Sequence, residues 1–365
     1  MWIWQQANWP EFFWDDVAIM PLLQEVRLNQ GILIGKAKGR SLSEHEAMLS
    51  TLLANIVHSS AIESEKLNAA SVRSSLARKL DIREDKPFPT SRQTDNLADM
   101  MLDAVLNFDS LLTLERLLGW HEGLFPEGYT LFNPIQGGVL RGDSPMQVVS
   151  GRLDKPTVHF EAPGRDSLEQ QLAAFVAWFN DSRHEATLDP LLRAGITHLW
   201  FITLHPFDDG NGRITRLLTD LALAQAENQS IRLYAMSVAI LDERKAYYHH
   251  LETTQKGDLN ITRWLSWFLN TLNTAIKQVL KDIDQVAFKT AFWQSVDQTR
   301  LTTEQVKVLN RLLAGDFPEG INTSQYHKVA KVSKATATRH LALLVELGCL
   351  VKKGGGRSTR YVIGT

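Results

Sequence analysis

The sequence predicts a mainly α-helical protein with one small β-hairpin and a smaller C-terminal unit. Apolar residues recur at helical spacing over most of the 365 residues. Residues 133–163 interrupt this pattern with glycines and prolines around two short extended runs, 146–149 and 157–160. Residues 300–365 then show a helix, a helix-turn-helix pattern and a second hairpin. We therefore expect a helical core followed by a separate small unit.

The composition is that of an ordinary globular chain. It is 44% hydrophobic and 22% charged, and its formal net charge of −2 indicates no particular partner. The single cysteine, Cys349, excludes an internal disulfide and agrees with a cytoplasmic location. The N-terminus has no basic region followed by an apolar core, and no run reaches about 18 apolar residues. We expect neither a signal peptide nor a membrane span.

Residues 1–40 are rich in aromatic side chains and have apolar residues at helical spacing. The aromatic residues crowd the first turns of the chain, at Trp2, Trp4, Trp9, Phe12, Phe13 and Trp14. Two interpretations remain open. The segment can be a small helical part that packs its aromatic rings on the core, or it can present a patch that binds a partner.

One stretch, residues 205–216, begins with a histidine that is placed to act as a base. Apolar spacing predicts a helix over 191–204. Pro206 disfavours helical geometry at the residue before it, so the helix ends at His205. The imidazole is then at the edge between helix and loop, where it can reach a substrate.

The rest of this stretch suits a phosphate group. The Gly210-Asn211-Gly212 turn lets several backbone N–H groups converge on an anion in front of a second helix, 213–225. Asp209, one residue before the turn, can hold Mg²⁺ beside a phosphate. Arg213 and Arg216 are three residues apart and share a helix face, so both can bind phosphate oxygens.

The whole stretch, His-Pro-Phe-Asp-Asp-Gly-Asn-Gly-Arg-Ile-Thr-Arg, resembles the signature of the Fic family, H-P-F-x-(D/E)-G-N-G-R-x-x-R, without a gap. The resemblance implies a Fic-type helical core that transfers AMP from ATP to a Tyr, Thr or Ser hydroxyl of a protein, including this protein itself. It makes His205 the general base and Asp209 the Mg²⁺ ligand. The resemblance also implies that Phe207 packs inward and fixes the loop.

The resemblance also implies which residues bind the phosphates of ATP. The amides of Gly210, Asn211 and Gly212, with the Asn211 side chain, would cradle them. Arg213 and Arg216 would bind the outer phosphates, which leave as pyrophosphate. In such a transfer the protein mainly positions the reacting groups and stabilises spread negative charge.

Upstream, Ser59-Ser60-Ala61-Ile62-Glu63-Ser64 lies at the end of a predicted helix, about 55–66. Alone, this is a serine-rich helix end with an exposed acidic pair. It resembles the inhibitory motif (S/T)-x-x-x-E-(G/N) of one Fic subset, except that Ser64 stands where Gly or Asn is usual. The resemblance implies that Glu63, with Ser59 before it, pairs with Arg216 and excludes the γ-phosphate. Alternatively, Glu63 orients a water molecule that removes AMP from a modified protein.

Three other features are assigned with alternatives open. The hairpin over about 145–161 resembles the flap by which Fic proteins hold a target segment through strand addition, but it can also simply close the edge of the core. Tyr247 and Tyr248 resemble tyrosines near the adenine in Fic proteins and can equally pack in the core. His121 lies on an apolar helix, and we expect it to be a packed histidine and not a metal ligand.

A linking helix, 276–299, precedes a unit, 300–365, that resembles a winged helix-turn-helix. From residue 321 onward there are eight Lys and Arg residues and one Glu, a net charge of +7, which leaves −9 for the rest of the chain. This asymmetry is typical of contact with nucleic acid. The unit can instead serve dimerisation or the docking of a target protein. The candidate DNA contacts are Lys334, Thr336, Arg339, Lys352, Lys353 and Arg357.

We therefore expect an N-terminal segment (1–40), a Fic core (41–275), the linking helix and the C-terminal unit. The first functional hypothesis is an Mg²⁺-dependent protein adenylyltransferase restrained by Glu63, with ATP, a protein target and a second copy of the chain as partners. The second is a DNA-binding regulator whose Fic core senses a nucleotide. A third is an enzyme that removes AMP with the help of Glu63.

Overall fold

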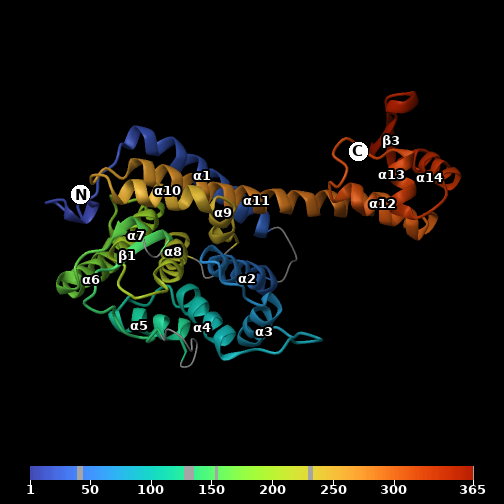
Figure 1. Ribbon diagram of the computed structural model, residues 1–365. Helices are drawn as coiled ribbons and strands as arrows, with labels where there is room; N and C mark the ends of the chain where they lie inside the picture. Colours follow the sequence, from blue (N-terminus) through green and yellow to red (C-terminus); the bar gives the residue numbers. More distant parts are fainter. Residues whose placement is uncertain (39–43, 127–134, 153–154, 229–232, 365) are drawn as a thin grey trace. The chain divides into compact units, whose positions relative to one another are not determined.

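The computed structural model describes residues 1–38, 44–126, 135–152, 155–228 and 233–364. The chain divides into two compact units, Met1–Lys277 (unit 1) and Gln278–Thr365 (unit 2), which are treated separately below. Helices dominate both units (Figure 1), and the predicted mainly helical fold with a small antiparallel hairpin is confirmed. None of the helices in these ranges combines the length and apolar character that crossing a membrane requires.

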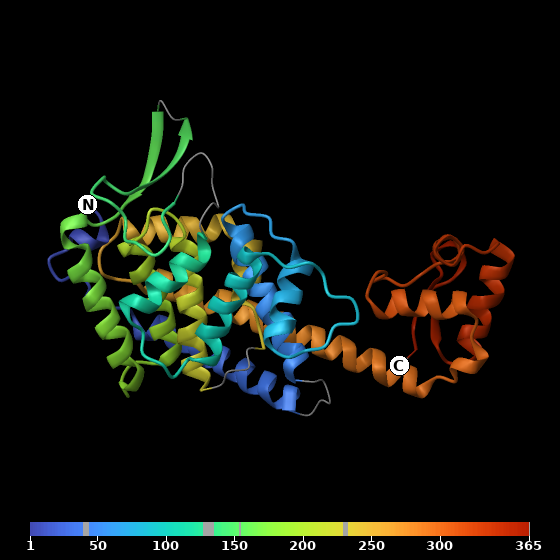
Figure 2. The ribbon, with the colours of Figure 1, turned by 90° about the horizontal axis from the view of Figure 1, so that it is seen from below.

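Unit 1 is a bundle of helices with one hairpin at its edge. The helices are α1 (Asp16–Lys38), α2 (Glu44–Ile62), α3 (Ala69–Lys79), α4 (Arg92–Leu106), α5 (Leu114–Leu124), α6 (Arg165–Asp181), α7 (Pro190–Leu204), α8 (Asn211–Glu227), α9 (Met236–Asp242) and α10 (Arg244–Gln255). The hairpin consists of β1 (Gln147–Arg152) and β2 (Lys155–Glu161). Figure 2 shows the hairpin extending away from the helices.

The helix α11 (Thr262–Ser295) begins in unit 1 and ends in unit 2. Residues 276–295 of the expected linking helix, 276–299, are therefore the second half of one continuous helix, which ends at Ser295. Its sequence contains neither glycine nor proline, so nothing in it interrupts the backbone hydrogen bonds.

The centre of unit 1 is the antiparallel pair α7 and α8, joined by the loop 205–210. Every residue of α7 from Leu191 to Leu204 is buried, and most of them are apolar, as expected of a helix at the centre of a bundle. Gly195 lets α11 approach closely, because an added β-carbon there would lie 2.9 Å from Leu265 Cδ2. Trp264 Nε1 donates a hydrogen bond of 2.8 Å to the Gly195 carbonyl at the same contact. The loop between α7 and α8 is thereby held on a rigid base.

The aromatic N-terminal segment packs on unit 1. Trp4 Nε1 donates a hydrogen bond of 2.7 Å to the carbonyl of Glu161 on β2. The rings of Trp9 and Phe12 meet Trp200 of α7 edge to face, with centroids 6.2 and 6.0 Å apart. Of the two interpretations, the structure therefore favours packing on the core for these rings.

The hairpin contains a β-bulge beside the helices. Val148 pairs with Phe160 and Val149 with Val158, so His159 has no partner across the ladder. A bulge turns a side chain out of the regular alternation. Here His159 Nε2 lies 2.6 Å from Ser150 Oγ, and Nδ1 lies 3.0 Å from Glu252 Oε2 on α10. The hairpin is thus tied to the helical core through its bulged residue.

Unit 2 contains α12 (Thr303–Leu313), α13 (Thr323–Ala330), α14 (Lys334–Glu346) and the antiparallel strands β3 (Leu350–Lys353) and β4 (Arg360–Ile363). Its own apolar core includes Val308, Tyr326 and Leu341. The residue that caps α13 is Asn322, whose side-chain oxygen accepts a 2.8 Å hydrogen bond from the Gln325 amide. The assignment of this unit as a winged helix-turn-helix stays a prediction.

Candidate active site

The loop between α7 and α8 carries the predicted base. His205 adopts left-handed geometry (φ 49°, ψ 57°), so α7 ends just before Pro206, as the sequence predicted. His205 Nδ1 lies 3.1 Å from the Ile202 carbonyl and can reach it only as a donor, which leaves Nε2 with its lone pair. Burial lowers the pKa of this imidazole below its ordinary value. The ring is therefore neutral at pH 7 and suited to accept a proton.

The side chain of Asn211 closes the loop. It was predicted to contact phosphates, but its oxygen accepts a hydrogen bond from the Phe207 N–H at 3.0 Å, and its nitrogen donates one to the Phe207 carbonyl at 2.8 Å. The buried amide therefore fixes the loop, and contact of its remaining N–H with a phosphate stays a prediction. The first backbone amides of α8 still follow Gly210, whose φ of 82° sets the turn.

His121 of α5 supports the loop by stacking on its residue Phe207. Their rings stack with centroids 4.0 Å apart and planes 7° from parallel. His121 Nδ1 accepts a hydrogen bond from the Gly138 N–H at 3.0 Å, so Nε2 carries the proton and donates to the Asp209 carbonyl at 3.2 Å. Burial lowers the pKa of His121 to about 4. The residue is packed, as expected, and it also positions the loop, which the sequence did not reveal.

Arg141 is a second supporting residue that the sequence analysis missed. Its side chain is buried, and its Nε donates a hydrogen bond of 2.9 Å to the His205 carbonyl, while Nη2 donates to the Pro163 carbonyl. Its backbone N–H donates to the Pro206 carbonyl at 2.9 Å. Arg141 thus holds the loop to the end of the hairpin segment. A lone arginine in a glycine-rich loop gave no signal of this role.

The segment after α2 places a carboxylate on Arg216. Arg216 Nη2 donates to Glu63 Oε1 at 2.8 Å and to the Ser59 carbonyl at 3.0 Å, and its Nε donates to Ser59 Oγ at 2.8 Å. Burial alone would raise the pKa of Glu63, but the charges and hydrogen bonds of Arg216 lower it overall. The structure therefore brings Ser59, Glu63 and Arg216 together as an ionised, hydrogen-bonded cluster.

Glu63 occupies the space in front of α8. An ideal β-carbon on Gly212 would lie only 2.2 Å from Glu63 Oε1, so a side chain at this position would displace the carboxylate. The carboxylate thus lies against the first turn of the helix, where backbone N–H groups and the helix dipole favour an anion. A phosphate group that bound in the same place would have to displace it.

Ser64 adopts a left-handed backbone geometry, which explains why the motif usually has Gly or Asn at this position. Its φ is 66°, a region in which a residue with a β-carbon is strained. Arg244 Nη2 donates a hydrogen bond of 3.1 Å to Ser64 Oγ. The departure from the motif is therefore accommodated without moving Glu63 away from Arg216.

Glu65 holds the first arginine of the stretch, and sequence reasoning did not assign it this role. Arg213 Nη1 donates to Glu65 Oε2 at 2.9 Å, and Gln93 Nε2 donates to Glu65 Oε1 at 2.7 Å. The Arg213 guanidinium also lies 5.1 Å above the ring centre of Phe125. The sequence feature that could have indicated this role was the acidic pair of Glu63 and Glu65, which are two residues apart.

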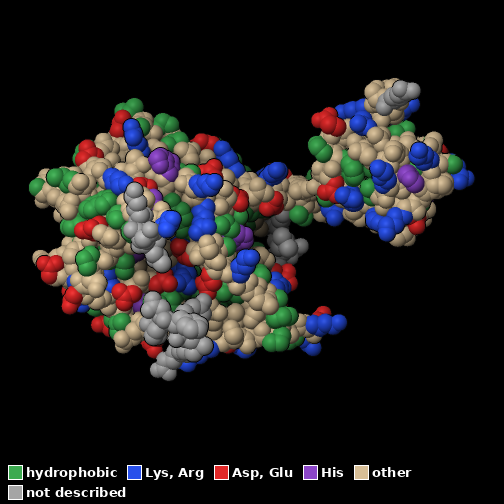
Figure 3. Space-filling view, viewed as in Figure 1, with side chains coloured by type: hydrophobic (Ala, Val, Ile, Leu, Met, Phe, Trp, Pro, Cys, Tyr) green, Lys and Arg blue, Asp and Glu red, His purple; other side chains and the backbone are tan. Residues whose placement is uncertain are grey.

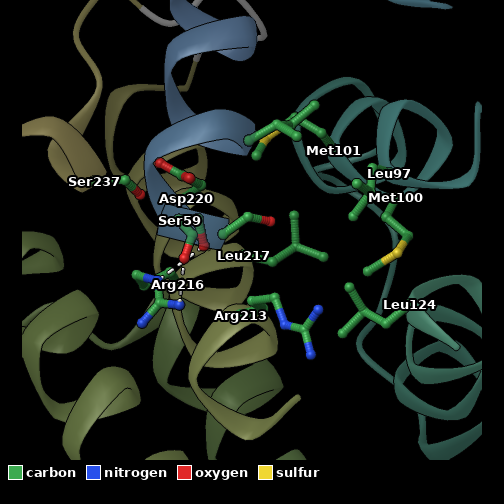
Figure 4. Close-up of a pocket in the computed structure, with 12 residues that line it drawn as sticks. Ser59, Leu97, Met100, Met101, Leu124, Arg213, Arg216, Leu217, Asp220 and Ser237 are labelled. Atoms are coloured by element: carbon green, nitrogen blue, oxygen red, sulfur yellow. Dashed lines mark hydrogen bonds between the residues drawn. The ribbon is translucent and has the colours of Figure 1, made fainter. Parts of the chain in front are cut away.

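A cavity of about 30 Å³ lies behind the two arginines, between α2, α4 and α8 (Figure 4). Arg213 and Arg216 line it together with apolar side chains such as Met100 and Leu217. Arg213 Nε and Arg216 Nη1 are buried and have no hydrogen-bond partner among the described residues. Buried donors without partners are costly, so both arginines are suited to donate further hydrogen bonds to ligand oxygens.

The two tyrosines of α10 have different environments. Tyr247 is buried, and its hydroxyl lies 2.9 Å from His198 Nε2, as the core-packing alternative expects, while contact of Tyr247 with a nucleotide stays a prediction. Tyr248 is partly exposed, and its hydroxyl donates to Glu63 Oε2 at 3.2 Å. Tyr248 therefore belongs to the site, and Tyr247 supports it from behind.

Asp209 lies at the entrance to the site with most of its carboxylate exposed, 3.8 Å from Arg213 Nη2. The described residues contain no cluster of three or more His, Cys, Asp or Glu side chains arranged to hold a metal ion. An Mg²⁺ ion needs only one or two protein carboxylates when phosphate oxygens and water complete its shell. The exposed oxygens of Asp209 fit that requirement.

The predicted DNA contacts of unit 2 are mostly exposed. Lys334 and Arg339 on α14 and Lys352 and Lys353 on β3 face solvent, and Figure 3 shows basic side chains across the visible face of this unit. Thr336 differs, because its hydroxyl lies 2.9 Å from Ser333 Oγ in the cap of α14. The side chain of Arg357 lies outside the part of the chain that the structure describes.

Comparison with known sequences identifies two segments. Residues 111–223 match the Fic/DOC family, and residues 2–82 match a domain of unknown function, DUF4172. Proteins described as "Protein adenylyltransferase Fic" from Drosophila melanogaster and Drosophila sechellia are each 28% identical over 207 residues, 56% of this chain and 38% of theirs. The chain thus spans less than half the length of these curated relatives.

Solved structures share the fold. A Fic family protein from Desulfovibrio desulfuricans aligns over 96% of this chain and 97% of its own, with a TM-score of 0.56 and 18% identity. Fic-1 from C. elegans aligns over 75% of each chain, with a TM-score of 0.50 and 21% identity. At these identities the likeness concerns the fold alone. Residues 111–223 are thus similar in sequence to the Fic/DOC family, and the fold is similar to that of solved Fic proteins.

Proposed function

We propose that this chain is a protein adenylyltransferase that transfers AMP from ATP to a hydroxyl of a protein target and is restrained by Glu63. The observation that carries the proposal is the state of the two motif arginines. Both are nearly buried, both are held by carboxylates, and both retain an unpaired donor. Carboxylate and phosphate compete for the same guanidinium geometry, so these pairs mark a place for phosphates. The curated relatives that bear the name adenylyltransferase agree with this function.

In the proposed reaction, the target hydroxyl attacks the α-phosphorus of ATP while His205 Nε2 takes its proton. The bond from that phosphorus to the bridging oxygen breaks, and pyrophosphate leaves. Arg213 and Arg216 bind the outer phosphates, and the amides at the start of α8 stabilise the charge that develops on the transferred group. Asp209 would hold Mg²⁺, which neutralises phosphate charge when bound. The hairpin of β1 and β2 would align an extended target segment by strand addition.

The test is incubation of the full chain with α-labelled ATP and Mg²⁺, with label on protein and intact mass as readouts. Three forms are compared: wild type, Glu63→Gly, and Glu63→Gly with His205→Ala. We expect weak labelling of wild type, strong labelling and a gain of one AMP in Glu63→Gly, and none in the double variant. Absence of labelling in all three forms, with ATP, GTP, CTP and UTP and with added cell extract as a target source, would contradict the proposal.

The same experiment separates restraint from AMP removal. If Glu63 orients water for removal, labelled protein that is purified and returned to buffer with wild type will lose its AMP, and Glu63→Gly will not release it. If Glu63 only restrains transfer, both forms leave the label in place.

Nucleic-acid binding by unit 2 is a second candidate function, and the local charge of +7 from residue 321 onward favours it. We propose that Lys334 and Arg339 on α14 and Lys352 and Lys353 on β3 contact phosphates of duplex DNA. Fluorescence anisotropy of the full chain with labelled duplex should show affinity that falls steeply with salt. Lys352→Gln with Lys353→Gln should reduce both the affinity and the salt slope. An affinity that these changes do not alter would exclude this surface.

A further inference from the structure

The outer face of α1 carries large apolar side chains that the rest of the described chain leaves uncovered. Val17 is 83% exposed, Leu28 64%, Met20 45% and Ile32 41%. The opposite face is buried on unit 1 through Ile19, Leu23, Val26 and Leu33. A surface helix normally presents a polar outer face, so an apolar one indicates an interaction surface. Figure 1 shows α1 along the upper edge of unit 1.

The outer residues follow the spacing of a helix-pairing seam. Val17 and Leu28 belong to a row whose positions alternate by four and three residues, at Val17, Pro21, Gln24, Leu28, Gly31 and Gly35, and Met20 and Ile32 flank this row. The seam carries no charge. The exposed charges beside it are directed to unit 1, since Glu25 pairs with Lys277 at 2.5 Å and Arg27 with Asp189 at 2.5 Å. A partner helix could therefore lie along the seam without burying a charge.

No contact in the described part of the chain explains two glycines in the seam. Glycine in a helix interior is destabilising relative to alanine. A β-carbon added at Gly31 or Gly35 would meet nothing within 4 Å, so no contact inside the described structure requires either glycine. Their common property is a flat helix surface, which allows the backbone of a second helix to approach closely.

The charges at the two ends of α1 identify the partner. Asp15 and Asp16 lie at its start, and Lys36 lies in its last turn. Two copies of α1 that pair antiparallel place the acidic end of one helix against the basic end of the other. A parallel pair would set like charges together. A two-fold axis near Leu28 would also bring the bulky Ile32 opposite Gln24 and the flat Gly35 opposite Pro21, which is self-complementary.

We propose that α1 is a homodimerisation helix, which pairs antiparallel with α1 of a second copy of this chain about a two-fold axis near Leu28. A helix of 23 residues is about 35 Å long. One helix pair of that length covers less than the roughly 800 Å² per partner of a standard interface. The dimer is therefore reversible and depends on concentration. This inference is independent of the adenylyltransferase proposal.

Sedimentation velocity of the full chain, without nucleotide, tests the dimer over a hundredfold range of concentration. We expect the wild type to shift from monomer to dimer, and Leu28→Glu with Ile32→Glu to weaken association at least tenfold. Leu111→Glu is the matched control, since Leu111 is 68% exposed on another part of unit 1. A wild type that stays monomeric throughout, or a dimer that the double change leaves intact, overturns the proposal.

Crosslinking tests the orientation without a disruptive change. With a short bis-maleimide, Leu28→Cys should crosslink to itself, because it lies near the two-fold axis. Val17→Cys should not, because antiparallel pairing separates the two copies of residue 17. The native Cys349 is buried, and the wild-type protein serves as the control for any crosslinking through it. Self-crosslinking of Val17→Cys as efficient as that of Leu28→Cys, or none at Leu28→Cys, contradicts the antiparallel dimer.

Discussion

Arg213 Nη1 donates a hydrogen bond to Glu65 Oε2 at 2.9 Å, just as Arg216 donates one to Glu63. The segment that follows α2 therefore supplies a separate carboxylate to each arginine of the motif. Gln93 holds the second oxygen of Glu65, so this carboxylate is fixed on both sides. Release of Glu63 alone leaves Arg213 occupied.

We predict that Glu65→Gln added to Glu63→Gly increases AMP transfer beyond that of Glu63→Gly alone. An amide cannot compete with phosphate for a guanidinium as a carboxylate does, so Arg213 becomes available to the outer phosphates. The expected effect is a severalfold lower KM for ATP, on the order of 1 kcal/mol of binding. The measurement is the initial rate of labelling as a function of ATP concentration.

Glu319→Gln is the control for this prediction, since it makes the same change at an exposed glutamate of unit 2. It should leave the KM of the Glu63→Gly protein unchanged. A KM that rises when Glu65 is replaced would mean that Glu65 orients Arg213 for ATP and does not restrain it.

Ser64 should respond to substitution in opposite directions. Because its φ is 66°, Ser64→Gly removes the strain of a β-carbon, while Ser64→Val adds a branched side chain where it fits poorly. We expect Ser64→Gly to be neutral or to stabilise unit 1 by up to about 1 kcal/mol, and Ser64→Val to destabilise it by about 1–2 kcal/mol. Ser64→Val should also displace Glu63 and raise labelling.

Urea unfolding and the labelling assay measure these effects. Ser50→Val, at an exposed position within α2, is the matched control and should change both readouts little. Equal behaviour of Ser64→Val and Ser50→Val would show that the left-handed turn does not control the position of Glu63.

The transfer reaction should persist to mildly acidic pH. Burial lowers the pKa of His205, so the neutral ring that acts as base persists below the ordinary histidine value of about 6.5. We expect the acid limb of kcat/KM for ATP in Glu63→Gly to have its midpoint below about 6.5. His249→Ala, at an exposed histidine, should leave the profile unchanged. A midpoint above that value would exclude His205 as a buried neutral base.

His121 should make stability depend on pH. Its pKa is about 4 when folded, and an unfolded histidine titrates near 6.5. The stability that the neutral ring contributes is complete above about 6.5 and is lost as pH falls towards 4, by up to about 3 kcal/mol in total. His121→Phe keeps the stack on Phe207 but removes this dependence, together with two hydrogen bonds.

Urea unfolding of wild type and His121→Phe at pH 7.5 and 5.0 tests this. At pH 7.5 the variant should be less stable by about 2 kcal/mol, because the Gly138 N–H and the Asp209 carbonyl lose a partner. At pH 5.0 the difference should shrink. A difference that is the same at both pH values would show that the ring is not held neutral by the fold.

The ends of the central helices could be predicted because their causes are local. Pro206 ends α7 at His205, and the glycines of the motif begin α8, as the order of residues indicated. The contact of Asn211 with its own loop could not be predicted in the same way. Its amide can bond either a ligand or the adjacent loop, and only the folded loop shows that Phe207 occupies both of its ends.

The contacts across the site join residues that are far apart in the chain. Glu65 and Arg213 are separated by 148 positions, and Arg141 and His205 by 64. No spacing rule connects such pairs, because their distance depends on how α2, α8 and the hairpin segment pack. The uncovered face of α1 is similar, since apolar periodicity does not say which of two apolar faces a helix buries.

The sequence by itself determined the chemistry available to this protein: a base, a glycine-flanked turn and two arginines in one uninterrupted stretch, with a carboxylate motif upstream. Those features depend on residue type and local backbone geometry, which short-range sterics decide. Tertiary structure decided which partners these groups meet. Packing of α2 against α8 places Glu63 and Glu65 on the two arginines, because buried guanidinium groups must find acceptors inside the fold.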